Sequence, residues 1–232
     1  IYFKYADDIQ ALTFFQDTRD DNLIAELHNV EEWCLCNGME LNANKTKVMN
    51  FVTKKSIEIS SLITTSGVTI ETVNVATILG VAISNDMKWK NHIDGIIKKA
   101  GQRLWIIRSL TYVNINNSPN WIWSVYYAVI RSILTYAFPA WCNLPTEQFQ
   151  RLCAIEKRVE RIINSSIEIP LKDYVENCCK RFAKIIKDNP QHPLSEIFLM
   201  APKTNTRSTT THVPHFAKTT RFKTSFTSFA NC

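Results

Sequence analysis

Paired CxxC motifs are absent from this sequence, although it contains seven cysteines. Their number is odd, and no histidine lies near them to complete a zinc set, so we expect neither a disulfide framework nor a structural zinc site. Nothing around Ile1 resembles a secretory or transit leader. We therefore expect reduced cysteines in an intracellular protein of the cytoplasm and nucleus. The cysteines are Cys34, Cys36, Cys142, Cys153, Cys178, Cys179 and Cys232.

The sequence also lacks a charge-free apolar run long enough to cross a bilayer. The nearest approach, residues 121–141, has Arg131 at its centre, where a charge is expensive in lipid. Pro139 ends its helical pattern early. We expect a buried helix of a soluble domain in this segment and no membrane partner.

Charge is distributed unevenly along the chain, which has 27 lysines and arginines against 21 acidic residues, or +6 in total. Acidic side chains outnumber basic ones in residues 1–50, whereas basic side chains predominate in residues 51–150 and 151–232. With 45% hydrophobic residues the chain can bury a sizeable core, which excludes wholesale disorder. A basic half beside an acidic segment is compatible with a nucleic-acid partner.

The first ninety residues predict short strands around one helix. Alternating apolar residues on either side of Asp7 and Asp8 predict two strands joined by a tight turn. Apolar residues at helical spacing then predict a helix that is capped within residues 20–22 and ends at Asn37. Further short strands are expected over residues 47–52 and, two or three in number, over residues 56–83.

The next hundred residues predict helices with basic outer faces, because their apolar residues recur at helical spacing. The helices are expected over residues 91–112, 119–138, 146–163 and 171–187. After residue 202 the composition shifts to Thr, Ser, Phe and scattered basic residues, and we expect poor order there. The fold class is therefore α+β, with domains at residues 1–90 and 91–189 and a tail at residues 190–232.

The pair Asp7 and Asp8, at the tip of the expected hairpin, is the sharpest chemical feature. Two adjacent carboxylates on a tight turn suit a hard cation such as Mg²⁺, and a two-metal site would serve phosphoryl transfer. Ordinary turn chemistry explains the same two residues equally well. The residues Tyr5-Ala6-Asp7-Asp8 alone do not decide between these interpretations.

Four segments, in order, resemble the reverse transcriptases of non-LTR (LINE-type) retrotransposons, the RTE and jockey kinds above all. Residues 3–8 (FKYADD) resemble the YxDD box, and residues 37–46 (NGMELNANKT) are similar to the G-x-x-L-N-x-x-K-T segment. Residues 78–81 (ILGV) with 89–93 (WKNHI) are similar to the family's LGV and W-x-x-H-I region, and residues 221–226 (RFKTSF) resemble R-[YF]-x-x-S-F. The resemblance implies the end of a polymerase palm, then an all-helical thumb and an irregular basic tail.

The resemblance also implies roles for individual residues. Asp7 would be a ligand of the catalytic Mg²⁺ ions, with Asp8 a partial contributor, and Tyr5 would line the floor near the primer terminus. Lys45 would lie near the departing pyrophosphate, or it is simply a solvated loop lysine. Leu79 and Gly80 would belong to the primer grip, or Gly80 marks a strand bend.

Other polar and aromatic residues have two interpretations or a structural one. Lys98, Lys99 and Arg103 form either a solvated surface or a stripe that contacts phosphates. His92 is expected to be a packed or capping histidine rather than a ligand. Trp33, Trp89 and Trp105 are expected to anchor the core.

The resemblance implies an RNA-directed DNA polymerase that uses Mg²⁺ to transfer deoxynucleotides from deoxynucleoside triphosphates to a DNA primer on an RNA template, with release of pyrophosphate. In that family the first palm motif, which supplies another metal-binding aspartate, and the fingers precede the YxDD box. This chain, which we expect to be part of something longer, has neither, nor an endonuclease domain, so we expect no activity from it alone. The alternatives are a non-catalytic nucleic-acid-binding relic of a retroelement and, less favoured by the ordered motifs, an interaction domain with a chance YADD.

Overall fold

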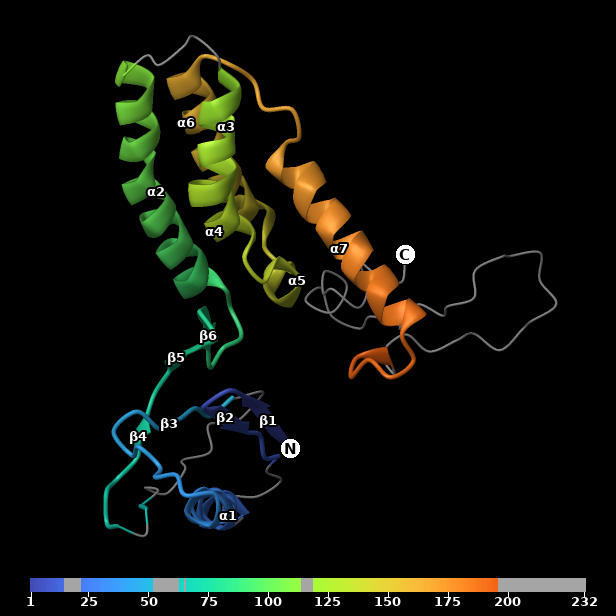
Figure 1. Ribbon diagram of the computed structural model, residues 1–232. Coiled ribbons are helices and arrows are strands. Elements are labelled where there is room, and N and C mark those ends of the chain that lie inside the picture. Colours follow the sequence, from blue (N-terminus) through green and yellow to red (C-terminus); the bar gives the residue numbers. More distant parts are fainter. Residues whose placement is uncertain (15–21, 52–62, 65, 114–118, 196–232) are drawn as a thin grey trace, which may run out of the picture. The chain divides into compact units, whose positions relative to one another are not determined.

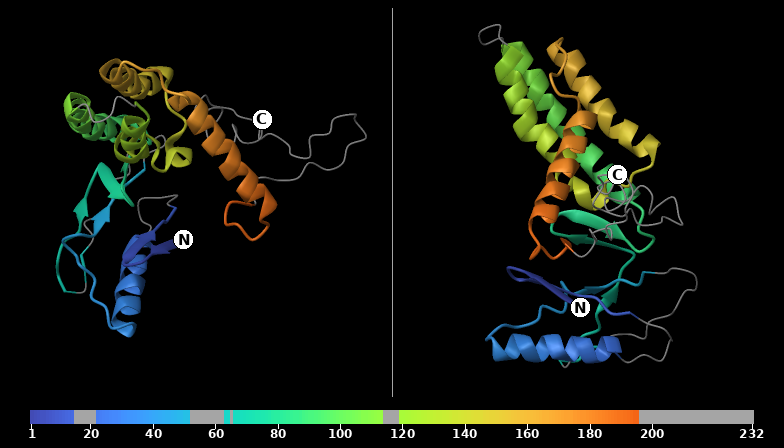
Figure 2. Two further views of the ribbon diagram at one scale, coloured as in Figure 1. Left: turned by 45° about the horizontal axis from the view of Figure 1, so that its top comes forward. Right: turned by 90° about the vertical axis from the view of Figure 1, so that its right-hand side faces the viewer.

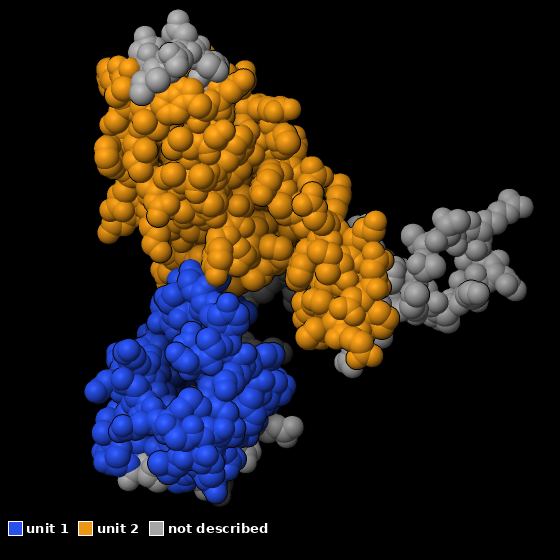
Figure 3. Space-filling view, viewed as in Figure 1, with its two compact units in different colours: residues 1–88 blue, residues 89–232 orange. Residues whose placement is uncertain are grey.

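The computed structural model describes residues 1–14, 22–51, 63–64, 66–113 and 119–195 (Figure 1). It divides into two compact units, residues 1–88 and residues 89–232, which Figure 3 shows in different colours. Helices and short strands are both present, so the predicted α+β class is confirmed. The expected tail lies, from residue 196 onward, outside the described residues, and the segment at residues 221–226 lies there with it.

The first unit begins with a β-hairpin. Strand β1 (Tyr2–Tyr5) pairs antiparallel with β2 (Asp8–Ala11), and Tyr5 lies opposite Asp8. The predicted hairpin is therefore confirmed, but its two-residue turn consists of Ala6 and Asp7, because this register makes Asp8 the first residue of β2. Ala6 has the positive φ, 50°, that such turns require.

Helix α1 (Asn22–Cys36) follows, close to its predicted limits. Its end is set by Gly38, whose φ of 67° favours glycine, and the Met39 N–H donates to the Cys34 carbonyl at 2.8 Å. The Lys4 ammonium lies 4.3 Å from the centre of the Trp33 ring, so a cation–π contact joins β1 to α1. Trp33 is nevertheless 36% exposed, and the expectation that it anchors the core is wrong.

The remaining strands of this unit are short. Strands β3 (Lys47–Val48) and β4 (Glu71–Thr72) are parallel, and β5 (Val75–Ile78) and β6 (Val81–Ser84) form a second antiparallel hairpin. Among the residues described in this unit, the buried hydrophobic side chains are only Cys34, Ile70 and Val81. The first unit therefore has little hydrophobic core within its described part.

The second unit consists of helices. They are α2 (Lys90–Val113), α3 (Pro119–Tyr126), the π-helical turn η1 (Tyr127–Arg131), α4 (Ser132–Thr135), α5 (Phe138–Trp141), α6 (Thr146–Ile163) and α7 (Leu171–Asp188). Helices α2, α3, α4 and α6 run side by side (Figures 1 and 2). The limits of α2, α6 and α7 agree with the predicted ranges within one or two residues, because strong apolar stripes define them.

The helix predicted over residues 119–138 is interrupted. A π-helical turn lies in its middle, and α4 ends at Thr135 because Ala137 takes a left-handed conformation with φ 51°. The short helix α5 then starts with Pro139 in its first turn, where a missing N–H costs nothing. The Trp141 indole N–H donates to the Tyr136 carbonyl at 2.9 Å and holds this corner together.

The core of the second unit is formed by facing apolar stripes of the helices. Its buried side chains include Ile93, Ile96, Leu104, Ile107, Tyr126, Ile130, Leu134, Trp141, Leu152, Ile155, Val159, Leu171, Val175 and Ile186. Trp89 is 8% exposed and donates its indole N–H to the Asn143 side-chain oxygen at 2.5 Å, so its predicted core role is confirmed. No helix in the described residues combines the length and apolarity needed to cross a bilayer.

Candidate functional site

The carboxylate pair lies at the tip of the first hairpin. Asp7 is the second turn residue, Asp8 opens β2, and both side chains are exposed, which confirms the predicted position. Tyr5, directly opposite Asp8, is 65% exposed. An ionised carboxylate in water keeps its hydration, so this position carries no desolvation penalty and leaves both groups accessible to a ligand.

The hairpin offers two carboxylates for a cation, and the rest of the described chain adds none. No group of three or more His, Cys, Asp and Glu side chains in the described residues could hold a metal ion. Mg²⁺ is usually bound by one or two carboxylates together with substrate phosphates and water. Asp7 and Asp8 therefore suit part of a magnesium site, but the described residues do not complete one.

Lys45 lies exposed in a turn that Asn42 closes. The Asn42 side-chain oxygen accepts from the Lys45 N–H at 3.2 Å, and its carbonyl accepts from the Thr46 hydroxyl at 2.9 Å. No hydrogen bond or ion pair of the described residues joins the Lys45 side chain to Asp7 or Asp8. The hydrogen bonds and ion pairs of the described residues thus do not connect this lysine to the carboxylate pair.

Leu79 and Gly80 form the two-residue turn between β5 and β6. Their φ values are 46° and 82°, and Ile78 lies opposite Val81 across the turn. Two consecutive positive φ angles match the strand twist in such hairpins, and glycine supplies the second without strain. Both residues are exposed, and Leu79 is 42% exposed, so this turn is a second accessible hairpin tip.

The three basic residues predicted on α2 do not share one face. Lys99 and Arg103 are one turn apart and so lie on the same side of α2. At about 100° per residue, Lys98 lies on a different side, opposite the buried stripe. Arg103 donates to the Val129 carbonyl of η1 at 2.8 Å, so part of its hydrogen-bonding capacity is used inside the unit. Trp105 is 64% exposed, and the expectation that it anchors the core is wrong, because it lies on the solvent side of α2.

A second basic surface lies on α6. Lys157, Arg158 and Arg161 are exposed and lie within about 100° of one another on the side opposite the buried stripe. None of the three forms an ion pair with an acidic side chain of the described residues. Cations without acidic partners on one helix face are free to meet an anionic surface.

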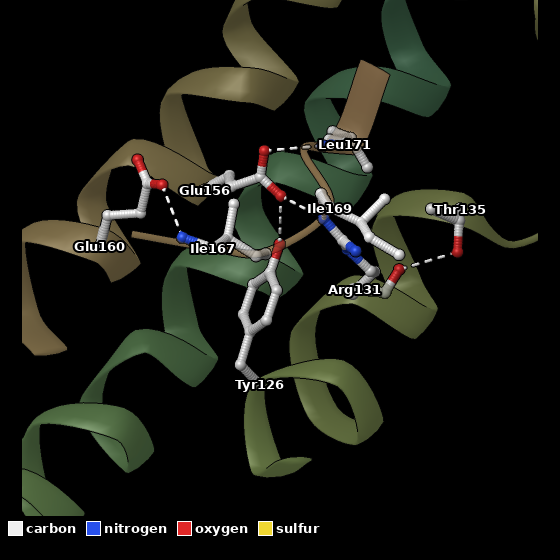
Figure 4. A network of polar contacts seen from close by, with 8 residues as sticks. All are labelled: Tyr126, Arg131, Thr135, Glu156, Glu160, Ile167, Ile169 and Leu171. Atoms are coloured by element: carbon white, nitrogen blue, oxygen red, sulfur yellow. Dashed lines mark hydrogen bonds and ion pairs between the residues drawn. The ribbon is translucent and has the colours of Figure 1, made fainter. Parts of the chain in front are cut away.

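A buried polar network joins the helices of the second unit (Figure 4). Arg131, which is 3% exposed, donates to the Glu156 carboxylate at 2.5 Å and to the Ile169 carbonyl at 2.5 Å. The same carboxylate accepts from the Tyr126 hydroxyl at 2.9 Å and from the Leu171 N–H at 2.8 Å. Glu156 thus binds a cation, a phenol and the first backbone N–H of α7.

The electrostatics of the network follow from its burial. The guanidinium of Arg131 lies 5.0–5.5 Å from the rings of Tyr126, Tyr127 and Tyr174. Burial opposes the charge of Arg131, but the hydrogen bond to Glu156 and the negative charge of that carboxylate outweigh burial and raise the pKa of Arg131. Burial, followed by the Glu156 charge, raises the pKa of Tyr126. Arg131 and Glu156 therefore form an ion pair, and Tyr126 stays a neutral donor.

The loop between α6 and α7 depends on the same helix. Glu160, one turn after Glu156, accepts from the Ile167 N–H at 3.0 Å, and Asn164 ends α6 with φ 54°. Two glutamates of α6 thus hold the backbone on both sides of Ile169. The network fixes where α7 begins, and so it is structural rather than catalytic.

His92 is buried beside two tryptophans, which confirms that it is a packed residue. Its ring centre lies 6.3 Å from that of Trp89 and 5.2 Å from that of Trp141. Burial, together with the positive charge of Lys99, lowers the pKa of His92 below its ordinary value.

Sequence reasoning found Arg131 but missed its partner. Glu156 occupies an apolar-face position of α6, between Leu152 and Val159 in the buried stripe. The sequence did contain a signal for this buried ion pair. Glu156 is a charge on the apolar face of one helix, and Arg131 is the opposite charge in an apolar segment of another.

In comparisons with known proteins, no family model, no curated protein and no solved structure matches this chain.

Proposed function

We propose that this chain carries the last part of the palm, including the primer-grip region, and the thumb of a reverse transcriptase of a non-LTR retrotransposon. The observation that carries the proposal is the exposed turn that presents Asp7, with Asp8 beside it, inside a sequence that resembles the YxDD box. The order of the other resembling segments, around residues 37–46, 78–81 and 89–93, supports it. The proposed reaction is Mg²⁺-dependent transfer of a deoxynucleotide to a DNA primer on an RNA template.

The hairpin itself supports the need for a further palm segment. Its residues Ile1, Tyr2 and Phe3 are 59%, 49% and 56% exposed, so apolar side chains lie open on both faces of the ribbon. An isolated two-stranded ribbon is marginally stable at best in water, and its outer edges offer free backbone groups. In the proposed enzyme, another strand and its carboxylate would cover this ribbon and complete the metal site.

The second unit supports a thumb, because its helices expose cations to a nucleic-acid backbone. Lys157, Arg158 and Arg161 form an outward face without acidic partners among the described residues, and Lys98 is exposed on α2. Binding through such residues releases counterions from the phosphates. Affinity for an RNA–DNA hybrid should therefore fall steeply as salt rises.

The second candidate is a non-catalytic nucleic-acid-binding protein of retroelement origin. It is favoured by the finding that the described residues bring together only two carboxylates and no third metal ligand. The two candidates differ in one measurable property, since only the first gains polymerase activity when a complementary palm segment is supplied.

The deciding experiment is primer extension on an RNA template with Mg²⁺ or Mn²⁺. The 232-residue chain alone should give no extension, because positioning and charge neutralisation supply most of phosphoryl-transfer catalysis and require more carboxylates. Addition of the fingers and first palm segment of a similar element should restore extension. Failure of any such combination to extend, with hybrid binding intact, would favour the non-catalytic protein.

Matched substitutions separate metal binding from charge. Asp7→Asn removes one carboxylate from the hairpin tip and should abolish the restored extension. Glu32→Gln removes an exposed carboxylate from α1 and should leave it unchanged. Equal activity of both variants would refute the role of Asp7.

A further inference from the structure

An aromatic and basic stripe runs along the solvent side of α2. Trp105 is 64% exposed and Tyr112 is 87% exposed, although large aromatic side chains usually bury most of their surface. No hydrogen bond or ring contact of the described residues involves either aromatic side chain. At about 100° per residue both aromatics lie away from the buried residues of α2, such as Ala100 and Leu104, and Figure 1 shows α2 at the edge of the helical unit.

The spacing puts these aromatics in one line with two cations. Lys98, Trp105 and Tyr112 follow one another at intervals of seven residues, which is about two helical turns or roughly 10 Å. Arg108 lies three residues after Trp105 and four before Tyr112, so it is next to both on the helix surface. The stripe therefore alternates flat aromatic faces with positive charges.

The charge of α2 indicates what the stripe can bind. The helix contains five lysines and arginines, and its single acidic residue is Asp94. Arg151 of α6 donates to the Asp94 carboxylate at 2.7 Å, so this carboxylate is already paired. An anion is thus favoured over a neutral or positively charged partner.

We propose that the Lys98–Tyr112 stripe of α2 binds single-stranded nucleic acid, with bases stacked on Trp105 and Tyr112 and phosphates against Lys98 and Arg108. Proteins that bind single strands without sequence preference use this combination of aromatic stacking and basic residues. A duplex hides the flat faces of its bases inside the stack, so the stripe distinguishes a single strand from a hybrid. The inference rests on the proposed function in taking nucleic acid as the partner, and it assigns the unpaired template or primer strand to this face.

The test measures fluorescence anisotropy of two labelled probes, an oligo(dT) of about 20 nucleotides and an RNA–DNA hybrid of the same length. Each of Trp105→Ala and Tyr112→Ala should raise the Kd for oligo(dT) about 5- to 100-fold, as loss of one stacked base does. Trp105→Phe and Tyr112→Phe retain an aromatic face and should remain close to the parent chain. Ile185→Ala, which removes an apolar side chain that is 52% exposed on α7, is the matched control and should have no effect.

Salt dependence and the second probe separate the possible outcomes. Lys98→Ala and Arg108→Ala should each lower the slope of log affinity against log salt by about 0.7 for the single strand. If the alanine variants bind oligo(dT) as the parent chain does while the hybrid still binds, the inference fails and the proposed function stands. If the parent chain binds neither probe, both fail. If the aromatic substitutions abolish self-association instead of oligo(dT) binding, the stripe is a protein interface and the inference is wrong.

Discussion

Removal of the Glu156 carboxylate tests how much the second unit depends on its buried network. Glu156→Ala leaves the guanidinium of Arg131, the Tyr126 hydroxyl and the Leu171 N–H without the acceptor that they share. Arg131 cannot regain water readily, because it is 3% exposed. Breaking a buried ion pair by removing one partner costs about 3–5 kcal/mol, since the remaining charge stays uncompensated.

The free energy of unfolding should be measured in urea, with circular dichroism at the helical band as the signal. Glu156→Ala should lower this free energy by about 3–5 kcal/mol and lower Tm by about 6–20 °C. Glu156→Gln keeps one acceptor oxygen in a side chain of the same size, so its loss should be smaller. The matched control is Glu176→Ala, which removes the exposed partner of Lys180 and should cost less than about 1 kcal/mol.

A double variant separates the ion pair from packing. Arg131→Met with Glu156→Leu replaces both charges by apolar side chains of similar volume. It should recover the part of the loss that comes from the uncompensated charge, because such replacements are often neutral or stabilising, whereas the Tyr126 hydroxyl and the Leu171 N–H still lack their acceptor. A loss from Glu156→Ala no larger than that from Glu176→Ala would refute the reasoning. So would a double variant that is less stable than Glu156→Ala alone.

Three further outcomes follow from local chemistry. Burial lowers the folded-state pKa of His92, so the folded protein favours the neutral imidazole. The resulting stability is complete above about pH 6.5 and is lost as the pH falls through the folded-state pKa. The free energy of unfolding of His92→Phe in urea should lack this pH dependence. The hydrogen bond from Cys179 lowers the pKa of Cys142, whereas burial raises that of Cys153. Iodoacetamide should therefore alkylate Cys142 faster than Cys153, and Cys179→Ala should slow the reaction at Cys142. Leu79→Asn should relieve the strain of the left-handed backbone at the β5–β6 turn and stabilise the hairpin by about 1 kcal/mol. Hydrogen exchange of the paired hairpin amides should then become slower, and an unchanged exchange rate would show that the turn is unstrained.

Local sequence determined the long helices and the hairpins. The stripe Leu152, Ile155 and Val159 repeats at helical spacing, and α6 begins and ends as this pattern predicts. The hairpin at Asp7 was predictable for a similar reason, since alternation on both sides of a turn residue is a strong short-range signal. The turn itself shifted by one residue, because the register of the paired strands, and not the residue type, chose Ala6 and Asp7.

Tertiary structure decided which side of a helix each aromatic or charged residue meets. Trp105 and Trp33 are large aromatic residues of the kind that usually anchor a core, but their positions on the helices lie away from the buried stripes. Residue type alone does not show on which side of a helix a side chain lies. Arg103 was expected to be either solvated or in contact with phosphate, yet it donates to the Val129 carbonyl in a π-helical turn 26 residues further along the chain. The exposure of a side chain depends on which neighbouring elements pack against its helix.

The same distinction applies to the site. The adjacency of Asp7 and Asp8 is a property of the sequence, and their exposure at a tip follows from the hairpin. The pairing of Arg131 with Glu156 was decided only when η1 and α6 packed together, because the two residues belong to different helices and neither helix alone shows which charge the other meets. Periodicity is local and can be read along the chain, whereas a buried charge selects its partner through the packing of segments distant in sequence.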